Sequence, residues 1–320
     1  MSDHWPNHAA MWREWRAALG GERMHHAWLL AGKRGLGKRT FALAAARELV
    51  AEPGIRQPED HPDIVHLTHL PKDDKEAKKR EEGKPFQTKR NIAVDQIREM
   101  QRRLTTRPTL GSRRAIIIDP ADDLEKSASN ALLKSLEEPP QGTFFLLVAH
   151  RPSRLLPTIR SRCRILRFLP LGENDLTDML AARGHPSDPD ALRAAGGSFG
   201  AALHFMEQDL GKAARLIDGL LTGGERGIIG RSELAREIGA RPDRQRLQAV
   251  LDLAQTLVAA RARSTEDPVF RAKLIECHAR LVALAGEAVT YNFDSGILSL
   301  EIGTLLVEAS EASEQPHGAQ

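Results

Sequence analysis

The sequence predicts an α/β fold with a parallel, doubly wound sheet in its first half and an all-helical region in its second half. Three short apolar runs, at residues 27–31, 115–118 and 143–149, alternate with segments of helical periodicity. That alternation is typical of buried parallel strands joined by crossover helices. A glycine-rich turn follows the first run and opens a helix, as in phosphate-binding loop proteins. We expect no strand beyond about residue 168.

Each predicted element has its own signal. Trp12 and Trp15 lie three positions apart within residues 1–20, so they share one face of a packing helix. Residues 38–51 are alanine-rich with a single apolar stripe, which indicates a helix. Asp95 is the expected N-cap of a helix over 94–105. Further strands are expected at residues 64–67 and 164–168, and a short turn or helix at residues 155–161. Further helices are expected at residues 127–137, 174–183, 189–195, 201–206, 231–238, 244–262, 269–287 and 296–309, and a frayed tail at residues 311–320.

The composition is that of an ordinary globular protein. Hydrophobic residues make up 41% of the 320 and charged residues 28%, and the formal net charge is +3. This mildly basic balance is compatible with nucleic-acid contact but does not require it. No apolar run is long enough to span a bilayer, and the N-terminus lacks the apolar core of a signal peptide. The two cysteines, Cys163 and Cys277, suit a reducing cytoplasm and form neither a disulfide framework nor a zinc site.

Residues 72–90 differ from the rest of the first half. They carry eight Lys or Arg and five Asp or Glu with almost no apolar side chains. Such a stretch cannot bury enough surface to order itself, so we expect a mobile insertion. A DNA-contacting role is the alternative interpretation.

The glycine-rich turn fits a phosphate-binding loop and then departs from it. Gly32, Gly35, Gly37 and Lys38 match G-x-x-x-x-G-K, in which backbone N–H groups curl around phosphates and the lysine reaches the β- and γ-phosphates. The next residue is normally Ser or Thr, whose hydroxyl binds Mg²⁺. Here it is Arg39, which has no acceptor and cannot ligate a cation. The residues suit retained ATP or ADP binding and an empty loop equally well.

The second half of such a site is altered in the same direction. Asp119 follows an apolar strand and is placed to hold a Mg²⁺-bound water. Active enzymes of this kind follow that acid with a Glu that polarises the attacking water, but here the next residue is Pro120. The loop and the strand end have thus lost the Mg²⁺ ligand and the general base independently. Together these changes predict a site that does not hydrolyse ATP.

Four stretches carry a family resemblance. NALLKSLEEPP at residues 130–140, the run at 144–163, HPDI at 61–64 and I-x-V-D-Q-I-R at 92–98 resemble bacterial DNA polymerase III clamp-loader subunits of the AAA+ superfamily. Their order and spacing match the delta-prime and gamma/tau subunits over roughly residues 25–170. The two altered site elements, and a chain without a long tail, favour the delta-prime type.

The resemblance assigns a role to the triplet Ser161-Arg162-Cys163. In this family the arginine of that triplet projects toward ATP bound by the next subunit and stabilises charge developing on the γ-phosphate. By resemblance, Arg162 is this arginine finger. The plainer interpretation is that Arg160, Arg162 and Arg164 only form a basic start to a strand.

The resemblance also implies an architecture and a set of partners. Residues 1–168 correspond to an AAA+ ATPase-like domain, 169–208 to a small helical lid and 209–320 to an all-α collar domain that joins subunits. The expected partners are gamma/tau and delta subunits in a hetero-pentamer, which loads the sliding clamp onto primed DNA. The chain is expected to act as a stator in the cytoplasm, not at a membrane. On its own it is not expected to catalyse a reaction, although the complex belongs to a DNA-directed DNA polymerase.

This sequence departs from the family pattern in two further respects. Many members carry a four-cysteine zinc module before the HPD stretch, but no cysteine occurs there, so we predict no zinc and no other bound metal. Gly200 stands where active members have a sensor arginine. Two rival functions fit the residues. An active AAA+ ATPase, such as a motor clamp-loader subunit or a helicase loader, would use Thr40 and Asp122 in place of the lost groups. A small-molecule P-loop kinase would not need Arg162.

Overall fold

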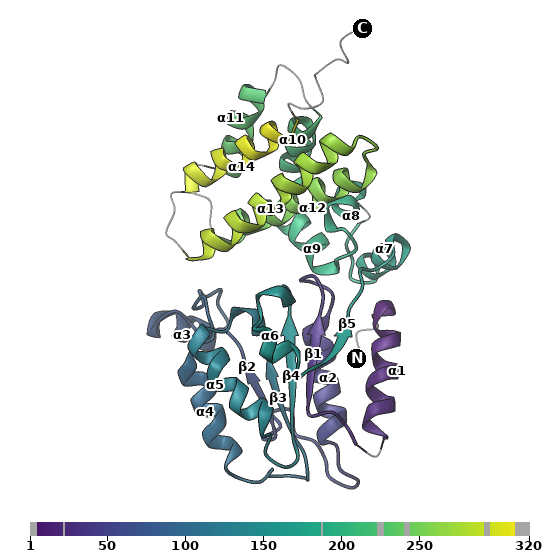
Figure 1. Ribbon diagram of the computed structural model, residues 1–320, viewed down its shortest axis with the longest axis vertical. Helices are drawn as coiled ribbons and strands as arrows, with labels where there is room; N and C mark the ends of the chain where they lie inside the picture. The colour runs from purple at the N-terminus through teal and green to yellow at the C-terminus, as the bar shows by residue number, and fades with distance from the viewer. Residues whose placement is uncertain are drawn as a thin grey trace. The chain divides into compact units, whose positions relative to one another are not determined.

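The chain folds into two compact units, Met1–Leu171 and Gly172–Gln320, drawn as ribbons in Figure 1. The computed structural model describes residues 5–21, 23–186, 188–222, 227–239, 244–290 and 295–310. The predicted frayed tail, residues 311–320, lies outside the described residues. Each unit is treated by itself below.

The first unit is built on a five-stranded sheet in which every neighbouring pair is parallel. The strand order is β2-β3-β4-β1-β5, so the glycine-rich loop leaves a strand that has neighbours on both sides. This confirms the predicted parallel α/β architecture. The strands are β1 (Ala27–Ala31), β2 (Ile64–Leu67), β3 (Arg114–Ile118), β4 (Thr143–Ala149) and β5 (Arg164–Arg167).

Helices cover both faces of this sheet, because alternate strand residues point to opposite sides. On one face, Trp28 and Leu30 of β1 pack in one cluster with α1 (Ala9–Leu19) and α2 (Lys38–Val50). On the other face, Leu29 packs with α4 (Val94–Leu104) and α5 (Lys126–Glu137). Figure 1 shows the two helix layers on either side of the sheet. The unit also contains α3 (Asp74–Glu81) and the short helices η1 (Pro6–His8), η2 (Ala121–Asp123), η3 (Pro152–Arg154) and α6 (Pro157–Arg160).

The predicted cap of α4 is wrong. The N-cap is Ala93, and Asp95 lies inside the first turn. The side chain of Gln96 instead reaches back to the N-cap residue: its Oε1 accepts the Ala93 N–H at 3.3 Å, while its Nε2 donates to the Thr68 carbonyl at 2.9 Å. A glutamine that also binds a distant carbonyl makes a cap that a local sequence rule does not detect.

The prediction that residues 72–90 lack ordered structure is also wrong. They contain α3 (Asp74–Glu81), whose first turn is capped by the Asp73 carboxylate accepting the Glu76 N–H at 3.0 Å. Glu76 in turn accepts the Gln87 N–H at 2.6 Å and an ion pair from Lys79 at 2.7 Å. A buried carboxylate with these partners closes the segment on itself without an apolar core, which explains why hydrophobicity gave the wrong expectation.

The second unit contains only helices among its described residues. Its core is one apolar cluster that includes Leu234, Val250, Leu281 and Leu306. The same cluster includes side chains from the region 169–208, such as Phe205, and the division into a lid and a collar stays a prediction. The helices are α7 (Glu173–Ala181), α8 (Pro189–Ala195), α9 (Phe199–Glu207), α10 (Gly211–Leu221), α11 (Gly227–Ile238), α12 (Arg244–Ser264), α13 (Pro268–Thr290) and α14 (Ser295–Ser310). Within the described part of the chain, no helix is both long and apolar enough to cross a bilayer.

Candidate functional site

The glycine-rich loop joins the carboxyl end of β1 to the first turn of α2, as its motif predicts. Gly35 and Gly37 have φ values of 79° and 74°, in the left-handed region that favours glycine. A Cβ on Gly32 would lie 2.5 Å from the carbonyl oxygen of Phe168, and a Cβ on Gly37 would lie 2.5 Å from the ring of Trp5. The shape of the loop and its neighbours therefore require these glycines whether or not a phosphate binds.

The N-terminal segment holds this loop in place. The Nε2–H of His8 donates to the carbonyl of Leu36 over 2.7 Å, and the ring of Trp5 stacks on His8 with centroids 5.1 Å apart. His8 also packs edge-on against Phe41 and Phe168. Burial lowers the pKa of His8, the hydrogen bond to Leu36 opposes this and the Lys38 charge adds to it. Sequence reasoning missed both contacts, because the segment is separated from the loop by α1 and β1.

Lys38 is turned into its own loop. Its Nζ donates to the carbonyls of Gly32 and Lys33, and the residue is only 2% exposed. Burial lowers the pKa of Lys38 to about 8, while the carboxylates of Asp122 and Asp119 oppose that shift. The amine is therefore mostly protonated at pH 7. Two of its three N–H groups are engaged by backbone oxygens of the loop, which leaves one for a phosphate oxygen.

Arg39 lies against the acid that would otherwise help to hold Mg²⁺. Its Nε is 3.8 Å from Oδ2 of Asp119, and His66 lies 3.9 Å from the same oxygen. Burial raises the pKa of Asp119, and the positive charges of Arg39 and Lys38 partly offset this. The structure thus brings together the predicted residues Lys38 and Asp119. It adds a guanidinium where the motif calls for a hydroxyl.

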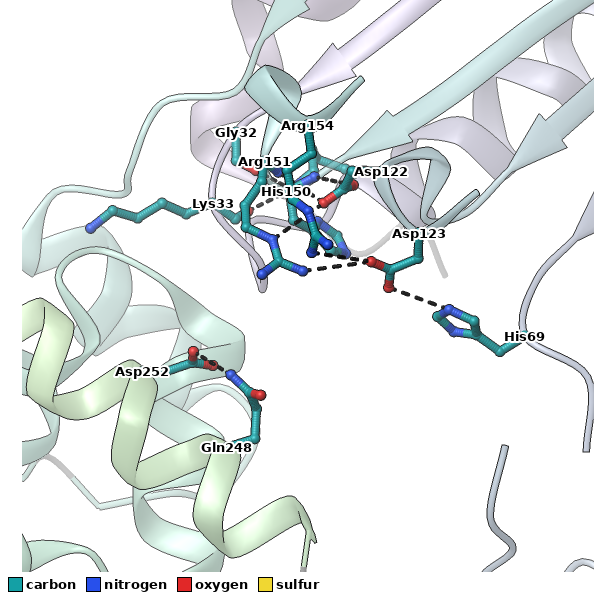
Figure 2. A network of polar contacts seen from close by, with 11 residues as sticks. Gly32, Lys33, His69, Asp122, Asp123, His150, Arg151, Arg154, Gln248 and Asp252 are labelled. Atoms are coloured by element: carbon teal, nitrogen blue, oxygen red, sulfur yellow. Dashed lines mark hydrogen bonds and ion pairs between the residues drawn. The ribbon is translucent and has the colours of Figure 1, made fainter. Parts of the chain in front are cut away.

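Asp122 is committed to the backbone. Its two carboxylate oxygens accept the N–H groups of His150 and Arg151 at 2.8 and 3.1 Å, and its side chain is 1% exposed. Figure 2 shows it within a polar network in which Asp123 also contacts Arg151 at 3.5 Å and His69 at 3.3 Å. Asp122 therefore fixes the turn after β4 and is not free to activate a water. The other candidate substitute, Thr40, is exposed on α2.

The aspartate of the stretch HPDI, like Asp122, binds backbone N–H groups and so has a structural role. The carboxylate of Asp63 is fully buried and accepts the N–H groups of Thr109 and Leu110 at 2.7 and 2.8 Å. The Arg114 guanidinium faces it at 3.6 Å. Paired in this way, a buried charge holds the segment before β3 against the start of β2.

Arg162 lies at the other end of the sheet from the loop. Arg164, two residues later, pairs with Trp28 near the amino end of β1, whereas the loop follows the carboxyl end. The carbonyl of Leu136, at the end of α5, accepts the Nε2–H of His26 at 2.9 Å, which places that helix end at the same corner. The two residues before Arg162, Arg160 and Ser161, line a hollow that also reaches Gly32 and Lys33 of the loop.

The three arginines of this corner have different partners. Arg162 donates from Nη1 to the Thr158 carbonyl at 3.0 Å and pairs through Nη2 with Glu137 at 2.7 Å. Arg164 pairs with Glu14 at 2.8 Å and lies over the ring of Trp28. Arg160 is exposed at the end of α6. The arginines do not therefore form a uniform basic patch, because each has its own environment.

The fold and loop define a P-loop protein of the α/β class in which Arg39 and Pro120 stand where the motifs call for a hydroxyl and a second acid. The model of the family described as DNA polymerase III, delta subunit, matches residues 7–172, more than half of the chain. The chain belongs to this family.

Named relatives agree with that assignment. The delta-prime subunit of Pseudomonas aeruginosa DNA polymerase III is 34% identical over 217 residues, covering 62% of this chain and 60% of the relative. The Escherichia coli delta-prime subunit is 34% identical over 203 residues, covering 58% and 56%. This chain thus matches somewhat more than half the length of each. A solved gamma subunit-related protein from Thermotoga maritima is 18% identical with a TM-score of 0.45, covering 94% of this chain and 99% of that one.

Proposed function

We propose that this chain is a delta-prime-type stator of a DNA polymerase III clamp loader. It assembles with ATPase subunits, leaves hydrolysis to them and lends Arg162 to the ATP site of a neighbour. Its own loop, with Gly32 and Lys38, and the neighbouring Asp119 after β3 serve as structural elements of the first unit.

One contrast carries the proposal. At the loop, Arg39 stands where the Mg²⁺-binding hydroxyl belongs and lies 3.8 Å from Asp119, while Lys38 donates to carbonyls of its own backbone. At the other end of β1, Arg162 stands at the surface with its side chain 36% exposed and part of its guanidinium unbound. A planar cation with several N–H groups suits the charge that develops on a transferring phosphoryl group. The chain thus lacks the means to cleave its own nucleotide but presents a group suited to another's.

Neither of the two residues that an active ATPase would need in place of the missing hydroxyl and acid is placed to act. Asp122 is held by two backbone N–H groups and buried, while Thr40 is exposed one helix position beyond the required hydroxyl. The same loss of groups disfavours a small-molecule kinase that uses this loop.

The wider assembly follows from the family. We propose that the partners are gamma/tau and delta subunits in a hetero-pentamer that places the sliding clamp on primed DNA in the cytoplasm. Residues 1–168 would form the ATPase-like domain, residues 169–208 the lid, and residues 209–320 the collar through which the subunits remain joined when nucleotide leaves.

The test is Arg162→Ala in the reconstituted complex. We expect unchanged assembly by size-exclusion chromatography. At the ATP site that the arginine faces, hydrolysis should be slower by about 10³-fold. The DNA-stimulated ATPase rate of the whole complex should fall by the fraction of the total rate that this one site contributes.

Arg160→Ala is the matched control, because it removes an exposed arginine from the same corner and should leave the rate unchanged. Normal ATPase in the Arg162→Ala complex would overturn the finger assignment. Brisk Mg²⁺-dependent ATP hydrolysis by the isolated chain would overturn the stator function itself.

A further inference from the structure

The carboxylate that holds Arg162 belongs to α5, outside the triplet that carries the arginine. Glu137 is the last residue of that helix, and its Oε1 lies 2.7 Å from Nη2 of Arg162. We propose that Glu137 is a positioning residue that orients the Arg162 guanidinium toward the neighbouring subunit's nucleotide. This proposal rests on the proposed function and deepens it.

Buried residues close in sequence to Glu137 and to Arg162 anchor the backbone on both sides of this ion pair. Leu136 is 1% exposed and Ile159 is fully buried, and the two belong to one apolar cluster under the sheet. The Leu136 carbonyl is additionally held by His26. Because the backbone is fixed at these positions, one ion pair and one hydrogen bond to a backbone carbonyl are enough to orient the Arg162 side chain.

The contacts leave part of the guanidinium available. An arginine has five N–H donors in one plane. Glu137 engages Nη2, and the Thr158 carbonyl accepts from Nη1. With one donor of each terminal nitrogen engaged, the remaining three can meet phosphate oxygens. The carboxylate also prevents the long side chain from sampling rotamers that point elsewhere, which matters because a misplaced group loses most of its effect on a transition state.

Stability does not account for the pair. The side chains of Arg162 and Glu137 are 36% and 48% exposed. Pairs exposed to this extent contribute at most about 1 kcal/mol, and often nothing measurable. Orientation of the guanidinium is therefore the effect to look for, and it appears in a rate, not in a melting temperature.

The next residue offers a matched control. Glu138 is an exposed carboxylate directly after α5, and among the ion pairs of the described residues the partner of Arg162 is Glu137. Replacing Glu138 removes the same charge from almost the same place without touching the guanidinium.

The experiment is a double-mutant cycle in the reconstituted clamp loader at saturating ATP and primed DNA. We expect Glu137→Ala to lower kcat at the site faced by Arg162 by about threefold to tenfold, with assembly and melting temperature unchanged. Glu137→Gln, which keeps an acceptor oxygen at the same distance, should recover part of the rate. In the Arg162→Ala background, Glu137→Ala should have no further effect. Glu138→Ala should behave like the wild type.

The outcomes separate this proposal from the one on which it rests. If Arg162→Ala leaves the ATPase unchanged, the finger assignment fails and positioning fails with it. If Arg162→Ala lowers the ATPase and Glu137→Ala does not, positioning alone is wrong. A faster ATPase in Glu137→Ala would mean that the carboxylate restrains the arginine, which also overturns positioning. Equal additive losses in the two backgrounds would show that Glu137 acts on something other than Arg162.

Discussion

The charged side chains at the two ends of β1 differ in their exposure and in their partners. At the carboxyl end, Lys38 is 2% exposed and bonded to backbone carbonyls, and Asp119 is faced by Arg39. At the amino end, Arg162 is 36% exposed and keeps donors free beyond its contact with Glu137. The first end resembles a site for nucleotide, but it carries a guanidinium where the motif requires a hydroxyl. The amino end has no nucleotide-binding motif, yet it presents a guanidinium that can act on a partner subunit.

This difference shows that a binding motif can outlast the chemistry for which it is known. Gly32 and Gly37 are held by close approaches to Phe168 and Trp5, so substitution there would strain the fold even if no nucleotide ever bound. Packing alone explains why the glycines stay when the hydroxyl next to Lys38 does not.

Asp122→Ala should give the largest effect on stability. It would remove the buried carboxylate of Asp122 and leave two partly buried N–H groups, those of His150 and Arg151, without their acceptor. We expect the free energy of unfolding, measured by urea titration, to fall by about 3 kcal/mol. Asp122→Asn, which keeps one acceptor oxygen, should lose less. If Asp122→Ala were as stable as the wild type and instead abolished an ATPase activity of the isolated chain, the carboxyl end of β1 would be a working site and the comparison would break.

Much of the fold could be predicted, because parallel strands buried on both faces are short apolar runs. The runs at Ala27–Ala31 and Thr143–Ala149 appear in the structure as β1 and β4 with the same bounds. The failures lie where polar side chains replace apolar contacts. Glu76 orders a charged segment through hydrogen bonds to Gln87 and Lys79, and hydrophobicity does not register such bonds.

The candidate site could be located from its motifs but its state could not. The spacing of Gly32, Lys38 and Asp119 is a property of the chain order. The direction in which Lys38 points, and the packing of Trp5 on Gly37, depend on contacts between separate segments. The same limit hides Glu137, since nothing in the order of residues indicates that this particular carboxylate meets Arg162.

The pH dependence of stability gives a second test at the carboxyl end of β1, with a smaller expected effect than Asp122→Ala. Burial, together with the charges of Lys38 and Arg34, lowers the pKa of His150 to about 3, so it is neutral in the folded protein. In the unfolded chain a histidine has a pKa near 6.5 and takes up a proton as the pH falls below that value. The stability associated with neutral His150 is thus present above pH 6.5 and is lost as the pH falls toward 3.

His150→Gln should therefore flatten the dependence of unfolding free energy on pH, by about 1 kcal/mol between pH 7 and pH 5.5. Urea titrations at several pH values measure it. His66→Gln is the companion variant, because burial and the Arg39 charge lower the pKa of His66 to about 4. Equal slopes for the wild type and His150→Gln would mean that the His150 ring takes up its proton in the folded protein at the same pH as in the unfolded chain. The cluster around Asp122 would then be more open to water than its contacts indicate.

Lys38→Met should give the smallest effect, and for that reason it separates the two ends of β1 most sharply. Within the described segments, the amine of Lys38 donates to the carbonyls of Gly32 and Lys33 in its own loop, and methionine keeps most of its apolar length. In the reconstituted complex we expect the DNA-stimulated ATPase to change by less than about twofold. The loop lysine of a partner ATPase subunit, replaced in the same way, is the control and should abolish hydrolysis at its own site. A tenfold loss on Lys38→Met, with assembly intact, would mean that nucleotide at this loop takes part in the cycle, so that both ends of β1, and not the amino end alone, would serve the ATPase.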